Sequence, residues 1–121
     1  MRTPIARALA YPERIESGVA PLDLTKVAAL SFEIPDMARF PCLRLAFDAI
    51  CNGNGASIVL NAANEVAVNA FLAGRIRFTE LVQVIGTVLE GMPAGAVNCI
   101  DAVLEMDKYA RLKAHEVINK L

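Results

Sequence analysis

Several residue types that carry catalytic chemistry are scarce in this chain of 121 residues. It has no tryptophan, three cysteines and a single histidine, His115. One histidine without a nearby Cys/His cluster argues against a zinc site. No Ser/His/Asp triad, Cys/His pair or phosphate-binding loop is recognisable by its spacing. The residues alone therefore predict no catalytic, cofactor-binding or metal-binding position.

The cysteines are few, odd in number and not preceded by a secretory signal. This combination predicts reduced thiols in a cytoplasmic protein. Cys42 and Cys51 would lie on opposite faces of one helix, too far apart for a disulfide. We expect these two residues and Cys99 to be small apolar packing residues.

An excess of charge of one sign is also missing. The 12 basic and 13 acidic residues are well mixed and give a net charge of -1, so no basic nucleic-acid surface is predicted. No apolar run reaches the roughly 18 residues of a membrane span. The hydrophobic content of 55% is enough for one well-packed domain. We therefore expect a globular protein without nucleic-acid or membrane partners.

The most apolar stretch is residues 58–74, IVLNAANEVAVNAFLAG. It predicts a helix that is enclosed on every side, begins near residue 56 and has Gly74 as its C-cap. Asn61, Asn64 and Glu65 gather on one side of this helix. We expect them to be buried polar residues with a structural role, because buried polar groups are normally hydrogen-bonded. The alternative is that Glu65 is a buried general base.

Two more helices are predicted in the first half of the chain. Residues 1–11 suit a short helix with Thr3 as N-cap and Pro4 at its first position. Residues 41–51 suit a second helix, which the Gly- and Asn-rich residues 52–55 end. The apolar face of this second helix carries Leu43, Phe47 and Ile50.

The segment between these helices, residues 12–36, has several prolines and no sustained period. Such a long irregular segment indicates an arm that joins two bodies. Residues 27–30 are apolar, and Phe32 and Ile34 alternate with polar residues, which suits either a short strand or an extended segment paired elsewhere. Apolar side chains exposed on this arm predict self-association, for example by exchange of the arm between copies.

Two helices are predicted after residue 74. One begins with Thr79 as N-cap and ends at Leu89 or Glu90, and Gly86 in its interior suggests close approach of another helix. Residues 99–104 form one or two separate turns, and Asp107 is the N-cap of the last helix. The prediction is an all-α fold: a small up-and-down bundle similar to a four-helix bundle, preceded by an extended, proline-containing arm.

Five sequence blocks add a family resemblance. They are MRTPIA at residues 1–6, SGVAPLDL at 17–24, FPCLRLA at 40–46, LNAANE at 60–65 and AFLAGRIRFTEL at 70–81. In order and spacing they resemble the C-terminal part of 1-deoxy-D-xylulose 5-phosphate reductoisomerase. The resemblance runs along the whole chain and implies roughly the last third of such an enzyme. It implies that residues 1–10 end the catalytic domain, 11–36 are the linking arm and 37–121 are the C-terminal helical bundle.

The resemblance also implies a function for the whole enzyme. That family converts 1-deoxy-D-xylulose 5-phosphate to 2-C-methyl-D-erythritol 4-phosphate in the non-mevalonate isoprenoid pathway. It uses NADPH and Mg²⁺, Mn²⁺ or Co²⁺ as a Lewis acid, and it is a homodimer. The nucleotide-binding domain, the metal ligands and the phosphate-binding residues of that family match no position in this sequence. We therefore expect the chain alone to be inactive. Its expected partners are the missing domains of the same enzyme.

Only Met1 and Arg2 would lie near the substrate pocket of the whole enzyme. The alternative function is a free-standing helical module for interaction or oligomerisation.

Overall fold

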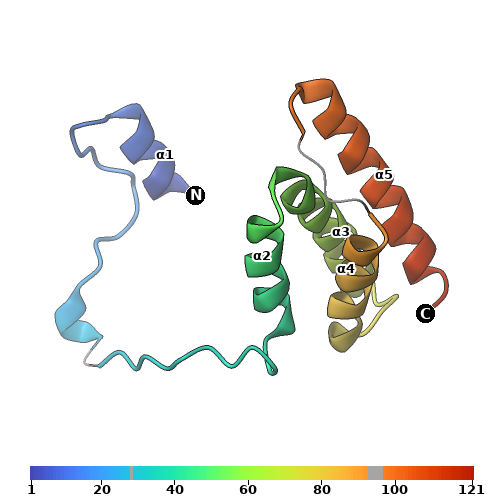
Figure 1. The fold of residues 1–121 in the computed structure, drawn as a ribbon. Helices are drawn as coiled ribbons and strands as arrows, with labels where there is room; N and C mark the ends of the chain where they lie inside the picture. The colour runs from blue at the N-terminus through green and yellow to red at the C-terminus, as the bar shows by residue number, and fades with distance from the viewer. Residues whose placement is uncertain (28, 93–96) are drawn as a thin grey trace. The chain divides into compact units, whose positions relative to one another are not determined.

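The computed structural model describes residues 1–27, 29–92 and 97–121. The chain divides into two compact units, Met1–Ile34 and Pro35–Leu121. In the described ranges the regular elements are all helical, which confirms the predicted all-α class (Figure 1). No helix in those ranges is both long enough and apolar enough to cross a bilayer.

The first unit contains helix α1 (Arg2–Leu9) and the short 3-10 helix η1 (Leu24–Lys26). The prediction of Thr3 as N-cap is wrong, because the helix already begins at Arg2 after Met1. Pro4 is therefore its third residue, where an N–H would have no helical partner anyway. α1 ends before Pro12, as predicted, and buries none of its residues.

The apolar end of the first unit forms no strand in its described part. Val27 ends η1, and residue 28 of the predicted apolar patch lies outside the described residues. Leu30, Phe32 and Ile34 follow as irregular chain with exposed side chains. The alternative of a short strand is therefore wrong for residues 29–34, whereas the alternative of an extended segment paired elsewhere stays a prediction.

In its described residues, 35–92 and 97–121, the second unit forms a bundle of four α-helices: α2 (Pro41–Cys51), α3 (Asn54–Leu72), α4 (Leu81–Glu90) and α5 (Ile100–Ile118). α3 packs against the other three helices, and the chain direction alternates from one helix to the next (Figure 1). This arrangement confirms the predicted up-and-down bundle. A short 3-10 helix, η2 (Phe78–Glu80), leads into α4.

The core of the bundle lies against one side of α3. Ala62, Ala63 and Ala67 are completely buried there, and such small side chains let neighbouring helices approach closely. The prediction that α3 is enclosed on every side is wrong, because its polar side remains exposed. The rest of the core cluster is Val59, Val66, Ala70, Ile76, Val84, Ile85, Val88, Ala110, Ala114 and Ile118.

Local signals set both ends of α3. Gly53 has φ 98° directly before the helix, so α3 begins at Asn54, two residues earlier than predicted. After the helix, Gly74 has φ 71°, and its N–H donates to the carbonyl of Phe71 at 2.9 Å. The N–H of Arg75 donates to the carbonyl of Ala70 at 2.9 Å. This pair of bonds is a Schellman motif, in which Ala73 is the C-cap and Gly74, predicted to be the C-cap, is the residue directly after it.

Two predicted N-caps in the second half are wrong. Thr79 lies inside η2, whose N-cap is Arg77, and the N-cap residue of α4 is Glu80. The N–H of Arg77 donates to Oε2 of Glu80 at 2.6 Å. Asp107 lies inside α5, which runs without a break from Ile100 to Ile118. Its carboxylate is occupied by Arg111 one turn later, so Asp107 does not compete for a helix start.

Candidate functional site

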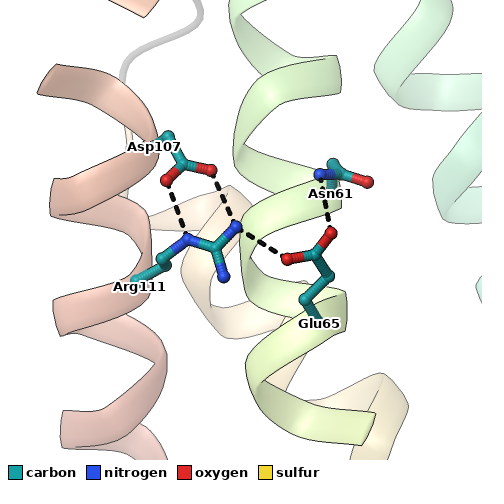
Figure 2. A network of polar contacts seen from close by, with 4 residues as sticks. All are labelled: Asn61, Glu65, Asp107 and Arg111. Carbon is teal, nitrogen blue, oxygen red and sulfur yellow. Dashed lines mark hydrogen bonds and ion pairs between the residues drawn. The ribbon is translucent and has the colours of Figure 1, made fainter. Parts of the chain in front are cut away.

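A polar network joins α3 to α5 across the surface of the bundle, and Figure 2 shows its four residues. Arg111 of α5 donates from Nε to Asp107 Oδ2 at 2.7 Å and from Nη2 to Asp107 Oδ1 at 3.1 Å. Its Nη2 also donates to Oε2 of Glu65 on α3 at 2.7 Å. Asn61 Nδ2 donates to the other oxygen of Glu65 at 3.5 Å, which completes the chain of contacts.

The sequence positions explain why these side chains meet. Asp107 and Arg111 are four residues apart on α5, and Asn61 and Glu65 are four apart on α3, so each pair lies on one helix face. The hydrogen bonds that Arg111 donates, first to Asp107 and second to Glu65, raise the pKa of Arg111 above its ordinary value. Arg111 therefore remains a cation between two carboxylates, which is the arrangement of a structural tie.

The burial predicted for the polar side of α3 is wrong. Asn61, Asn64 and Glu65 are exposed, and the described residues include no buried polar or charged side chain. The physical reason is that the other helices pack against the opposite, alanine-rich face of α3, so its polar face remains exposed to solvent. The Glu65 side chain is 51% exposed and paired with Arg111, so the burial that the general-base alternative requires is missing.

Sequence reasoning did not identify Arg111 as part of this network. The signal that was available is its spacing of four residues from Asp107, which is typical of an ion pair on one helix face. Its link to Glu65 spans 46 residues, and no local pattern predicts a pairing at that distance.

Met1 and Arg2 lie in the first unit, where Met1 is almost fully exposed and Arg2 begins α1. Their place near a substrate pocket stays a prediction. In the part of the chain that the structure describes, no three His, Cys, Asp or Glu side chains lie close enough to hold a metal ion.

The cysteines do not serve as packing residues. Cys42, Cys51 and Cys99 are all unbridged and exposed, which corrects the expectation that they fill the core. α3 and α5 supply alanines at the places where small apolar side chains are needed. His115 is exposed on α5.

The comparisons with known proteins agree with this architecture. Residues 1–113 match the family described as the DXP reductoisomerase C-terminal domain. The chain is 61% identical over 114 residues to the 1-deoxy-D-xylulose 5-phosphate reductoisomerase of Cupriavidus pinatubonensis, which covers 94% of this chain and 29% of that protein. It is 56% identical over 121 residues to the enzyme of the same name from Burkholderia mallei, covering 100% of this chain and 30% of the relative.

Solved structures give the same result. The 1-deoxy-D-xylulose 5-phosphate reductoisomerase from Zymomonas mobilis in complex with NADPH superposes with a TM-score of 0.85 at 37% identity, over 98% of this chain and 32% of that one. A DOX-P reductoisomerase in complex with NADPH, fosmidomycin and magnesium gives a TM-score of 0.77 at 43% identity, and the match covers 98% of this chain and 31% of that chain. The chain thus spans about 30% of the length of its relatives. Fold and sequence together show that it belongs to the family of DXP reductoisomerase C-terminal domains.

Proposed function

We propose that this chain is the C-terminal structural domain of an NADPH- and divalent-metal-dependent reductoisomerase. The enzyme would convert 1-deoxy-D-xylulose 5-phosphate to 2-C-methyl-D-erythritol 4-phosphate in the non-mevalonate isoprenoid pathway. The observation that carries the proposal is a match along 94–100% of this chain to relatives of that name, of which it covers only 29–30%. Relatives solved with NADPH and magnesium support the choice of cofactors.

Within that enzyme the bundle would supply packing and not reacting groups. The carboxylates of Glu65 and Asp107 are engaged by Arg111, so they hold two helices together. The divalent metal, Mg²⁺, Mn²⁺ or Co²⁺, supplies a Lewis acid when bound, and its ligands would belong to the rest of the enzyme. Met1 and Arg2 are the only residues that we place near the substrate, and the whole enzyme would act as a homodimer.

The test compares the full-length protein that carries this sequence with the chain alone. Each is incubated with 1-deoxy-D-xylulose 5-phosphate, NADPH and Mg²⁺, and both NADPH oxidation and product are measured. We expect turnover by the full-length protein and none by the chain alone. Turnover by the chain, or an inactive full-length protein, would refute the proposal. The intact mass of the native polypeptide tests the alternative of a free-standing module, which a natural product of 13.0 kDa would favour.

A further inference from the structure

Two Asn-Gly pairs follow each other where α2 leads into α3 (Figure 1). Asn52 and Gly53 form the whole connection between the two helices, whereas Asn54 and Gly55 are the first residues of α3. Asparagine is a thermolabile residue. A following glycine makes it more reactive, because no Cβ hinders the approach of the glycine nitrogen. Every other asparagine in the chain precedes a residue with a side chain, so these two pairs are the candidates for reaction.

The reaction is deamidation through a cyclic imide. The backbone nitrogen of the glycine attacks Cγ of the asparagine and forms an N–Cγ bond. The bond from Cγ to the side-chain nitrogen breaks, and that nitrogen leaves as ammonia with the proton of the glycine N–H. Water then breaks one of the two N–C bonds of the ring: loss of N–Cγ gives aspartate, and loss of the main-chain bond gives isoaspartate. Water is the only co-reactant, and nothing is oxidised or reduced.

The first pair is open to this reaction, since Asn52 and Gly53 are both exposed. The N–H of Gly53 donates to the carbonyl of Ile50 at 3.5 Å, which is longer than the usual range of about 2.7–3.2 Å. Both residues lie outside α2 and α3, so turning the Gly53 nitrogen towards Cγ of Asn52 leaves the interior hydrogen bonds of the helices intact. Gly53 also has φ 98°, so the turn itself requires the glycine that makes Asn52 reactive.

The second pair has the same chemistry but is held in place. Nδ2 of Asn54 donates to the carbonyl of Val97 at 2.9 Å, and its Oδ1 accepts from the N–H of Val97 at 3.2 Å. Gly55, which carries the attacking nitrogen, is buried. Asn54 is also the first residue of α3, so rotating its backbone towards the reactive geometry unwinds the start of the helix. Asn54 therefore reacts only in molecules that have opened locally.

We propose that Asn52 is a site of spontaneous deamidation and that Asn54, in the next pair of the same turn, is preserved. Either product adds a negative charge at residue 52. Isoaspartate also routes the main chain through Cβ, which lengthens a connection of only two residues between α2 and α3. The proposal follows from this turn alone and does not depend on the proposed function.

The rates of deamidation at the two positions test the proposal within one molecule. The full-length protein that carries this sequence is incubated at mildly alkaline pH, folded and in concentrated urea. Fragment ions that separate residue 52 from residue 54 are quantified over time by peptide mass spectrometry. In concentrated urea both asparagines should react at similar rates, because each precedes a glycine. In the folded protein Asn52 should react at least about tenfold faster than Asn54.

The ratio of the two rates in the folded protein decides the outcome. A ratio of one or less would overturn the proposal, and so would a folded protein in which neither residue reacts. Very different rates in concentrated urea would also contradict it, since the preference would then come from the local sequence and not from the fold.

Urea below the unfolding transition sharpens the comparison. Opening becomes more frequent as urea rises, so the rate at Asn54 should increase. The rate at Asn52 should stay nearly constant, because its reaction needs no opening. Circular dichroism of the same samples shows whether the helices remain folded. A rate at Asn52 that rises as steeply as that at Asn54 would mean that the fold protects both pairs, and it would contradict the proposal.

Discussion

Gly86 offers a quantitative test of the packing between α2 and α4. It lies in the interior of α4, and a Cβ added there would meet Leu45 Cδ1 at 4.0 Å as its nearest atom outside the local helix backbone. That distance is an ordinary van der Waals contact, so a methyl group fits, and close helix approach does not require glycine here. Glycine in a helix interior costs about 0.5–1 kcal/mol relative to alanine. Gly86→Ala should therefore raise the free energy of unfolding by that amount.

The expected gain is measurable. For a domain of 60–100 residues, about 1 kcal/mol shifts Tm by roughly 4–8 °C. Urea unfolding followed by circular dichroism gives the free energy directly, and the slope of the transition should stay constant because the exposed surface is nearly unchanged. A destabilised Gly86→Ala variant would refute the reasoning, since it would mean that Leu45 packs more tightly on α4 than the structure shows.

Gly74 is the matched control for this experiment. It has φ 71°, and an added Cβ would meet nothing within 4 Å. Gly74→Ala therefore changes only the backbone conformational energy, and the left-handed conformation costs an L-residue about 1–2 kcal/mol. The two glycine-to-alanine changes should have opposite signs. A neutral Gly74→Ala would show that the Schellman motif after α3 is not formed.

Three further predictions concern single side chains. Arg111→Met removes the ion pair between α3 and α5 and should lower the free energy of unfolding by about 0.5–1 kcal/mol. The loss should be smaller in high salt, because ions screen these partly exposed charges, and a salt-independent loss would contradict an electrostatic role. The hydrogen bonds that Arg77 donates, first from its side chain and then from its backbone N–H, lower the pKa of Glu80. Stability that is present above the unfolded-state pKa should therefore be lost as the pH falls below about 4. Glu80→Gln should flatten this part of the pH profile of Tm. Val84→Ala empties a fully buried position and should cost about 2–3 kcal/mol in urea unfolding, whereas a loss below 1 kcal/mol would place Val84 outside the core.

Helix bounds were predictable where a residue acts through its own backbone. Pro41 starts α2, and Gly74 ends α3, because their allowed conformations decide the local structure without help from the rest of the fold. Thr79 and Asp107 have side chains that suit an N-cap, but that property does not exclude other positions. In the structure α4 has Glu80 as its N-cap residue, and Asp107 lies inside α5, where its carboxylate pairs with Arg111.

The outward and inward faces were less predictable. Amphipathy shows which side of α2 is apolar, but it does not say whether the bundle or another body covers that side. For α3, the polar residues Asn61 and Glu65 were correctly grouped, while their exposure depended on how α2 and α5 flank them. The partner of Glu65 lies 46 residues away, so only the folded bundle reveals the network.

The central claim is that these residues form a supporting domain and that the reacting groups belong to the rest of the enzyme. The most direct measurement is calorimetric titration of the purified chain with NADPH and with Mg²⁺, beside the full-length enzyme under the same conditions. We predict saturable binding of NADPH by the full-length enzyme and none of either ligand by the chain. Saturable binding of NADPH or Mg²⁺ at one site on the chain alone would contradict the account.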